Sequence, residues 1–382
     1  MSLINFCQSD RQREVITLYE QLGSGIKVAN HLGVCRRGID KIVNRVKRHA
    51  ALQGYSPDHD MTRTVPDGFT VRGVSTYYNK DGKATGQWVK SRADDERRFE
   101  MLKEAIEVMC SEVPKIAPIQ QPKNTSDKLL NVIPIGDPHH GLLSWSSETG
   151  ADFDSDIAKR LTLGAVDRLM QSAPDADTCI ILPLGDVFHM NDQTNATPAS
   201  KHQLDVDSRY VKVLGIGIET YRHAIIRALE KHKNVVVRFV SGNHDPQAIW
   251  ALAFTIQAYF SDNPRVKVDL SPSKFWYYKF GQVLIGATHG DTAKHEALLG
   301  VMAADKSKDW GDTKHRYWYT GHVHHQSVKE FPGVVCESFR TLAAADAYAA
   351  GHGYRAGRDM VCITHHIEHG EIERHRCDIG LI

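Results

Sequence analysis

The feature that most constrains the fold of this 382-residue chain is a series of five short apolar runs, each ending in Asp, Asn or His. The runs are LLNVIPIGDPHHG (129–141), TCIILPLGDVFHMND (178–192), NVVVRFVSGNHD (234–245), QVLIGATHGD (282–291) and RYWYTGHVHH (316–325). Short stretches of aliphatic and β-branched residues bounded by Gly and Pro are typical of buried strands. The pattern predicts a sheet-based domain in which five strands deliver polar side chains at one end.

The polar residues that close these runs have the types and the spacing of metal ligands. They are Asp137, His139, Asp186, Asn243, His289, His322 and His324. Residues two apart at the end of a strand can bend round one ion, and the two oxygens of a carboxylate such as Asp186 can bridge two ions. Asp, Asn and His without Cys suit octahedral Mn²⁺, Fe or Zn²⁺ rather than a structural thiolate zinc site. A single His after a strand is more often a hydrogen-bonded structural residue, but five such motifs in series favour a metal centre.

Composition narrows the class of protein. The chain has 47 Lys and Arg against 46 Asp and Glu, and 41% hydrophobic residues, which is ordinary for a globular protein. Its seven Cys are scattered and never spaced CxxC, which argues against a disulfide framework and favours a reducing cytosol. No run reaches the ~18 apolar residues of a membrane helix, and the first residues lack the layout of a signal peptide. We therefore expect a cytoplasmic protein without a membrane partner.

A polar stretch containing three prolines, residues 111–127, is predicted to be a linker. Up to residue 126 there are 20 Lys and Arg against 15 Asp and Glu, and beyond it 27 against 31. A basic front piece therefore precedes an acidic back piece. We expect a helix-turn-helix domain over residues 1–55, a hairpin plus an amphipathic helix over 56–110, and a metal-binding domain over 128–382.

The front piece is predicted to begin with three helices, the last two forming a helix-turn-helix. Ala29 would allow close helix crossing, Gly33 would make the tight turn, and Ile39 and Ile42 would face inward. The last of these helices also carries six cations against the single acid Asp40. The six are Arg36, Arg37, Lys41, Arg45, Lys47 and Arg48. They favour DNA binding, with a solvated face or a module that docks a protein partner as the alternative.

Two further segments have open interpretations. Residues 68–92 are predicted to form a hairpin turning at Asp81 and Gly82, and its mixture of cations and aromatic rings suits nucleic-acid contact as well as packing on the neighbouring helices. The apolar stripe of the helix predicted over 92–110 indicates core packing or, less often, a dimer seam. The tail is predicted to form an exposed hairpin turning at Gly370, whose histidines offer an adventitious metal site as the alternative.

The motifs DPH, GDVFH, GNHD, THG and GHVH resemble, in order, the signature blocks of the calcineurin-like metallophosphoesterases, across residues 128–382. The resemblance implies an α/β (α+β) fold, a two-layer β-sandwich flanked by helices, with two metals at one sheet edge. One metal would be held by Asp137, His139, Asp186 and His324, and the other by Asp186, Asn243, His289 and His322. A hydroxide shared by the two ions would attack phosphorus in line. His244, oriented by Asp245, would donate a proton to the leaving oxygen or stabilise the transition state.

Within that family, GDVFH followed by an Asn is similar to the SbcD-like DNA repair nucleases and unlike the Ser/Thr protein phosphatases, which have Asp-Arg-Gly after the second aspartate. In the SbcD-like branch the histidine that matches His189 lies beside the metals and helps to position DNA. A helix-turn-helix fused to such a core also resembles phage-encoded phosphoesterases. SbcD-like enzymes carry a capping domain and ATPase-binding helices after the last motif, whereas 58 residues follow His324 here, which puts an ATPase partner in doubt.

The sequence therefore predicts a DNA phosphodiesterase, a nuclease, that uses two divalent ions. Mn²⁺ is the first choice of ion, with Fe and Zn²⁺ as alternatives. We expect DNA as its partner and a cytoplasmic location, that of a bacterial host if a phage encodes it. The alternatives are a phosphatase acting on nucleotides or phosphoproteins and a DNA-binding regulator with an inactive core. The oligomeric state is left open, with a dimer as one option.

Overall fold

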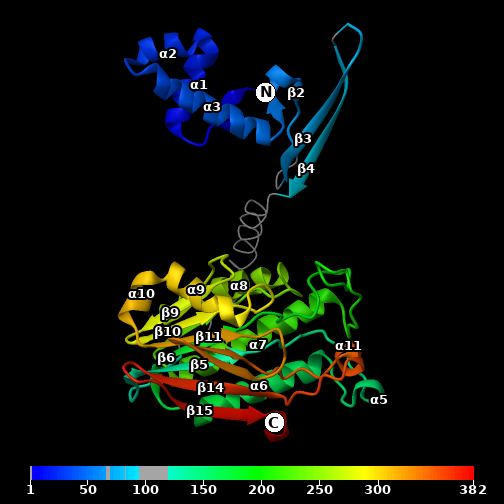
Figure 1. Ribbon diagram of the computed structural model, residues 1–382, viewed down its shortest axis with the longest axis vertical. Coiled ribbons are helices and arrows are strands. Elements are labelled where there is room, and N and C mark those ends of the chain that lie inside the picture. The colour runs from blue at the N-terminus through cyan, green and yellow to red at the C-terminus, as the bar shows by residue number, and fades with distance from the viewer. Residues whose placement is uncertain (1, 66–68, 82, 94–118) are drawn as a thin grey trace. The chain divides into compact units, whose positions relative to one another are not determined.

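The computed structural model describes residues 2–65, 69–81, 83–93 and 119–382 (Figure 1). The chain divides into two compact units, Met1–Ala105 and Ile106–Ile382. Residues 94–110 of the predicted amphipathic helix and residues 111–118 of the predicted linker lie outside the described residues. No helix among the described residues is long and apolar enough to span a bilayer.

The first unit begins with the three predicted helices. After the short 3₁₀ helix η1 (Leu3–Phe6) come α1 (Asp10–Leu22), α2 (Gly25–Leu32) and α3 (Arg36–Leu52). The side chains of Ser9 and Ser24 cap α1 and α2, and Gly23 and Gly33 end them in the left-handed conformation that glycine adopts without strain. The three helices share one core, formed by Val15, Ile16, Val28, Ala29, Ile39, Val43 and Val46. Their presence is as predicted, but the buried residue beside Ile39 is Val43, whereas Ile42 is only partly buried.

A two-stranded ribbon follows the helices. After β1 (Tyr55–Ser56), η2 (Pro57–His59) and β2 (Met61–Thr62), the strands β3 (Phe69–Tyr78) and β4 (Ala84–Ala93) pair antiparallel. The amide of Asn79 donates to the carbonyl of Lys83 at 2.9 Å and closes the turn. The hairpin is therefore where the sequence predicted it, and β3 contacts α3 within this unit (Figure 1).

Two sheets form the centre of the second unit. The six-stranded sheet has the order β15-β14-β5-β6-β7-β8, and the five-stranded sheet has the order β12-β13-β11-β10-β9. The strands of the first are β5 (Ser126–Ile135), β6 (Ala176–Pro183), β7 (Asn234–Arg238), β8 (Val266–Asp269), β14 (Asp359–His366) and β15 (Gly370–Asp378). Those of the second are β9 (Trp276–Phe280), β10 (Val283–Ala287), β11 (His315–Thr320), β12 (Ser327–Phe331) and β13 (Val334–Ser338). β5 to β8 run parallel, as do β10, β11 and β13.

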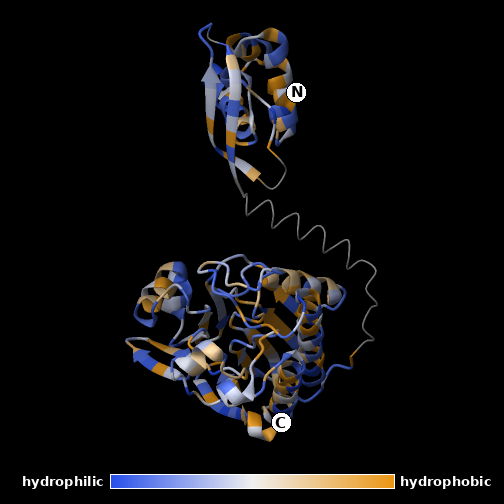
Figure 2. Cartoon of the chain, turned by 90° about the vertical axis from the view of Figure 1, so that its right-hand side faces the viewer, coloured by the Kyte–Doolittle hydropathy of each residue, from blue (hydrophilic) through white to orange (hydrophobic). Residues whose placement is uncertain are grey.

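One hydrophobic core lies between the two sheets. Alternate residues of strands from both sheets meet in it, among them Leu130, Val132, Ile180, Leu182, Trp276, Val283, Ile285, Tyr319 and Ile363. This alternation is the period-2 pattern of a strand with one face turned inward. The hydrophobic residues, orange in Figure 2, lie on the strands and helices in the interior of this unit. The unit is therefore a two-layer β-sandwich.

Helices cover the outer faces of the sandwich. The six-stranded sheet is contacted by α6 (Ser155–Ser172), α7 (Tyr210–Lys231) and α8 (Ala248–Tyr259). On the other sheet, Leu298 and Met302 of α9 (His295–Asp305) pack against Leu284 and Trp318, and α10 (Ser307–Asp312) follows α9. The short helices α5 (Ser146–Thr149) and α11 (Ala347–Gly351) contact each other, and η3 (Ile379–Leu381) ends the chain. The predicted fold class is confirmed.

Two prolines lie inside strands that the sequence predicted to be central. Pro134 of β5 pairs with β6, but the ladder between β5 and β14 ends at Val132. Pro183 of β6 likewise lies beyond the ladder between β6 and β7, which ends at Ile181. Each proline therefore sits where one neighbouring strand has already ended, and no ladder hydrogen bond is lost on that side.

The predicted tail hairpin forms, with Gly370 at positive φ at its turn, but it is not an exposed pair. β14 is an inner strand that pairs with β5, and its residues are buried up to His365. The side chain of His365 lies 2.8 Å from the hydroxyl of Tyr319 across the core. The expectation of an exposed strand pair was wrong because β14 pairs with β5 and leaves β15 at the edge of the sheet, a long-range pairing that local sequence does not specify.

Candidate metal centre

The five apolar runs of the sequence are β5, β6, β7, β10 and β11, and the loops that follow them converge. The first three belong to one sheet and the last two to the other, so the polar side chains arrive from both layers of the sandwich. Five of the residues in these loops, Asp137, His139, Asp186, His322 and His324, have positive φ values between 42° and 68°. Such a conformation is uncommon for residues other than glycine and is concentrated at functional sites.

The first set of candidate ligands comprises Asp137, His139 and His324, whose ligand atoms all lie within 4.8 Å of one another. The Nε2 atoms of His139 and His324 are 3.1 Å apart, and Nε2 of His324 is 3.7 Å from Oδ1 of Asp137. Asp137 and His139 are buried. One carboxylate and two imidazole nitrogens converging at these distances fit a divalent cation.

The second set comprises Asp186, His289 and His322. Nδ1 of His289 donates to the carbonyl of Leu184 at 2.8 Å, which leaves the lone pair of Nε2 free for a ligand. That Nε2 atom lies 3.2 Å from Oδ2 of Asp186 and 3.0 Å from Oδ1 of Asn243. Asn243 therefore joins the second set, as expected.

The two sets adjoin each other. Nδ1 of His289, in the second set, is 3.8 Å from Oδ1 of Asp137, in the first. The carboxylate of Asp186 raises the pKa of both His139 and His324, although burial outweighs it and leaves both pKa values below the usual range. Asp186 thus acts on both sets, which is the relationship expected of a bridging carboxylate.

Burial and neighbouring charges shift the pKa values of the titratable groups in the centre. Burial raises the pKa of Asp137 to about 8. Burial also lowers the pKa of His324 to about 4, so its imidazole is neutral. For His289, burial alone would lower the pKa, but the carboxylates of Asp186 and Asp137 raise it to about 10. These shifts leave a proton on Asp137 and on His289 near pH 7, and a divalent cation held by the centre would displace both protons.

Backbone amides hold both carboxylates in place. The amide of His322 donates to both oxygens of Asp137 at 3.0 Å, and the amide of His244 donates to Oδ1 of Asp186 at 2.8 Å. Glycines make this approach feasible. A Cβ at Gly242 would lie 2.0 Å from Oδ1 of Asp186, and one at Gly321 would lie 2.5 Å from Oδ2 of Asp137. The Gly before Asn-His and the Gly before His-x-His are therefore required by close packing against a ligand.

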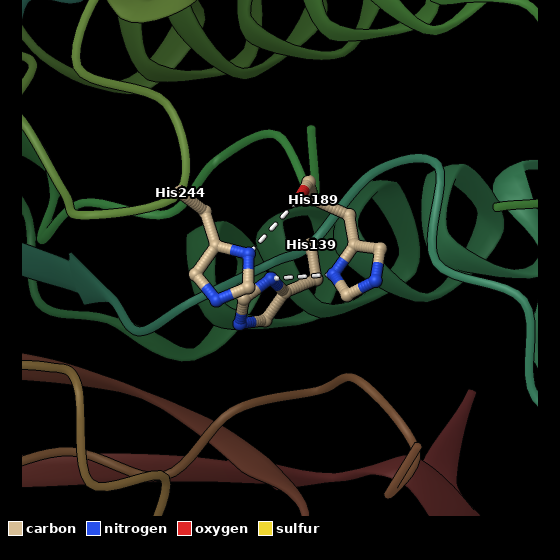
Figure 3. A group of neighbouring side chains, drawn as sticks. All are labelled: His139, His189 and His244. Atoms are coloured by element: carbon tan, nitrogen blue, oxygen red, sulfur yellow. Dashed lines mark hydrogen bonds between the residues drawn. The ribbon is translucent and has the colours of Figure 1, made fainter. Parts of the chain in front are cut away.

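His139, His189 and His244 form a third cluster of imidazoles (Figure 3). Nδ1 of His244 lies 2.9 Å from the carbonyl of His189, and Nδ1 of His189 lies 3.3 Å from Nδ1 of His139. The sequence predicted that Asp245 orients His244, and here the structure differs. Asp245 accepts from the amides of Phe188 and Gly242, and the carbonyl of His189 orients His244 instead. Asp245 is buried, and through these two amides it links the two ligand loops.

Three groups outside the predicted ligands and catalytic residues support the centre. The hydroxyl of Thr341 donates to the carbonyl of Asp137 at 2.6 Å. Oδ1 of Asn191 accepts from the amides of Gln247 and Ala248 and so fixes the start of α8 beside the GNHD loop. The third group is the Leu184 carbonyl described above. Asn191 is the Asn that follows GDVFH, a position noted in the sequence without a role, whereas no sequence signal marks Thr341.

The six cations predicted to contact DNA divide into two groups on α3. Arg36 pairs with Asp40 at 3.3 Å, and Lys47 pairs with Asp58 at 3.0 Å. The other four are exposed and have no acidic partner within the described part of the chain; they are Arg37, Lys41, Arg45 and Arg48. At 3.6 residues per turn these four lie opposite the buried face of α3, which carries Ile39, Val43, Val46 and Ala50. They form one continuous exposed surface, called the basic face of α3 below.

No protein-family model matches the sequence, and no curated protein matches it. Among solved structures, the fold is similar to a dimetal phosphatase from Danio rerio (8% identity, TM-score 0.35), covering 65% of this chain and 99% of that one. It is also similar to Vps29 complexed with Zn²⁺ from Entamoeba histolytica (15% identity, TM-score 0.29), and this match covers 65% of this chain and 99% of that one. A third similar structure is a 5′-nucleotidase from Candida albicans (11% identity, TM-score 0.33), and this match covers 69% of this chain and 54% of that one.

Proposed function

We propose that this chain is a dimetal phosphoesterase of the calcineurin-like kind that hydrolyses phosphodiester bonds in DNA. The observation that carries the proposal is the convergence of five loops, from both sheets, on two adjoining sets of Asp, Asn and His ligands. Two neighbouring ions are the usual device for in-line displacement at phosphorus. The order of the five motifs, which resembles that of the calcineurin-like family, supports the same reaction.

The two sets would hold divalent ions, Mn²⁺ first among the candidates and Fe or Zn²⁺ as alternatives. Bound there, the ions would neutralise charge on the phosphate and lower the pKa of a water molecule. Asp137, His139 and His324 would hold one ion, and Asn243, His289 and His322 the other, with Asp186 shared between them.

His244 would be the group that moves a proton. Because its Nδ1 is hydrogen-bonded to the carbonyl of His189, the ring is fixed and Nε2 is left for the substrate. A proton on Nε2 can pass to the leaving oxygen, or it can be shared with a phosphate oxygen as negative charge develops. His189 would act through His139, its hydrogen-bonded neighbour, rather than on the substrate itself.

DNA as the substrate is supported by the basic face of α3. Four unpaired cations on one side of a helix can neutralise phosphates and release counterions, which gives binding that weakens with salt. Because α3 and the metal centre belong to one chain, DNA held by α3 is present at a raised effective concentration for cleavage.

The test compares a diester, a monoester and DNA. With Mn²⁺, the full chain is expected to hydrolyse bis-p-nitrophenyl phosphate and to cut DNA. Asp137→Asn should abolish both activities and leave the affinity for DNA nearly unchanged. Hydrolysis of p-nitrophenyl phosphate alone would identify a phosphatase and overturn the diesterase assignment. Salt-sensitive DNA binding without hydrolysis of any ester would identify a regulator with an inactive core.

A further inference from the structure

The β3–β4 ribbon presents two large aromatic side chains to solvent on one face. Tyr77 and Trp88 are 64% and 65% exposed. In the ladder Trp88 stands opposite Ser75, and Tyr77 stands opposite Gly86, so the two rings are diagonal neighbours. The ring of Trp88 lies over Gly86, where a Cβ would be 3.7 Å from it. We call this surface, with the exposed Lys90 on the same side, the outer face of the ribbon.

The opposite face of the ribbon is held by its own unit. The hydroxyl of Tyr78 donates to Asp60 at 2.9 Å. The side-chain Nε2 of Gln87 donates to the hydroxyl of Thr76 at 3.0 Å and to the carbonyl of His59 at 3.4 Å. These contacts fix which face is turned inward, and because side chains alternate along a strand they direct Tyr77 and Trp88 outward. Neither ring has a ring partner or a hydrogen bond within the described part of the chain.

The ribbon is also positively charged. Within residues 69–81 and 83–91 it carries Arg72, Lys80, Lys83 and Lys90 against the single acid Asp81. None of the four cations forms an ion pair with a residue that the structure describes. Hydrophilic and hydrophobic residues are mixed along both strands (Figure 2). A surface that offers flat rings and unpaired cations together is complementary to a strand with stacked bases and a phosphate backbone.

We propose that the outer face of the ribbon binds the unpaired bases of a single-stranded DNA segment. Aromatic rings stack on bases of any sequence, and neighbouring cations attract the backbone, which is the combination found in single-strand binding surfaces. The inference deepens the proposed function and rests on it. With duplex DNA on the basic face of α3 and an unpaired strand on the ribbon, the preferred substrate is a duplex that carries a single-stranded tail.

The experiment measures binding of the full chain to three labelled DNAs by fluorescence anisotropy. These are a blunt duplex, the same duplex with an oligo-thymidine tail, and the tail alone. The tail is expected to strengthen binding of the duplex. Trp88→Ala and Tyr77→Ala are each expected to weaken binding of the tailed duplex about tenfold, in line with stacking energies of about 1–3 kcal/mol per base, and to leave binding of the blunt duplex unchanged.

Two control variants accompany these measurements. Tyr348→Ala and Tyr354→Ala each remove a tyrosine of the other unit, and these tyrosines are 62% and 61% exposed. Both should bind all three DNAs like the unchanged protein. Circular dichroism of each variant checks that the fold is retained.

A tail that adds no affinity, or a Trp88→Ala variant that keeps the full effect of the tail, would overturn the inference. So would a change from dimer to monomer in sedimentation of Trp88→Ala without any change in DNA binding, because the face would then contact a second copy of the chain. Hydrolysis of bis-p-nitrophenyl phosphate with Mn²⁺ is measured on the same samples. If the unchanged protein does not hydrolyse this ester, the proposed function is overturned. If it hydrolyses the ester but the tail adds no affinity, only the inference about the ribbon is overturned.

Discussion

The Nδ1 atoms of His139 and His189 lie 3.3 Å apart, so one of the two rings donates a hydrogen bond to the other. Nε2 of His139 lies in the first ligand set, where it needs a free lone pair, and its proton therefore sits on Nδ1. His189 is the acceptor. Burial lowers the pKa of His189 to about 3, which keeps its ring neutral and able to accept. We infer that His189 is a positioning residue for His139, a ligand in the proposed metal centre.

We expect His189→Ala to weaken binding of Mn²⁺ by roughly 10–100-fold, because a ligand ring that loses its outer hydrogen bond is no longer held in one tautomer and orientation. Calorimetric titration of the metal-free protein measures the effect. His189→Gln keeps an acceptor and should restore part of the affinity. If metal affinity were unchanged and only DNA binding fell, His189 would contact DNA directly, as the resemblance to the SbcD-like nucleases implies.

Asp186→Asn should lower the number of bound ions from two to at most one, since one carboxylate acts on both ligand sets. Metal analysis after dialysis against Mn²⁺ gives the stoichiometry. The variant also removes the carboxylate that lies 3.2 Å from Nε2 of His289 and raises the pKa of that ring, so we expect its metal-free form to unfold at a lower temperature than the unchanged protein. Two tightly bound ions in Asp186→Asn would contradict the assignment of a shared ligand.

The sequence identified the strands that carry the centre because their signal is local. Each is an apolar run closed by polar residues, and all five are strands of the structure. Which sheet each strand joins was not accessible, since periodicity describes the faces of a strand and not its neighbours. The place of β14 between β15 and β5 has the same explanation.

Contacts within the centre were harder to predict than its members. The partner of His244 is a backbone carbonyl, that of His189, and its position depends on the path of the loop. The resemblance to the calcineurin-like family implied Asp245 instead. Thr341 reaches Asp137 across 204 residues of chain through one hydroxyl group, and an isolated Thr carries no pattern. Long-range contacts of single side chains are what a single sequence conveys least.

Cations on the basic face of α3 should contact DNA, whereas a cation of the same helix that is already paired with an acid should contribute less. Lys41→Ala and Arg45→Ala should each weaken DNA binding similarly for all sequences and reduce the slope of log affinity against log salt by about 1. Lys47→Ala is the matched control, because Lys47 already pairs with Asp58. Anisotropy titrations at several salt concentrations measure the slopes. Equal effects of the three substitutions would show that DNA does not contact this face, and hydrolysis of the small diester should be unchanged in all of them.

A buried network away from the metal centre predicts how stability depends on pH. Nδ1 of His232 donates to the carbonyl of Ala228, and its Nε2 lies 2.9 Å from Nδ2 of Asn131, which donates to it. The hydroxyl of Thr364 completes the network by donating to Oδ1 of Asn131 at 2.8 Å. Each polar atom has a partner only while His232 is neutral. Burial accordingly lowers the pKa of His232 to about 4.

In the unfolded chain the pKa of a histidine is ~6.5, so below that pH protonation favours the unfolded state. The contribution of His232 to stability is therefore fully present above ~6.5 and is lost as the pH falls towards 4. Between pH 7 and pH 5 the loss is about 2 kcal/mol for this one group. Urea unfolding of the metal-free protein at the two pH values measures it. His232→Gln should be less stable at pH 7 and should lose about 2 kcal/mol less between pH 7 and pH 5. Equal losses in the two proteins would show that His232 is not kept neutral by the fold.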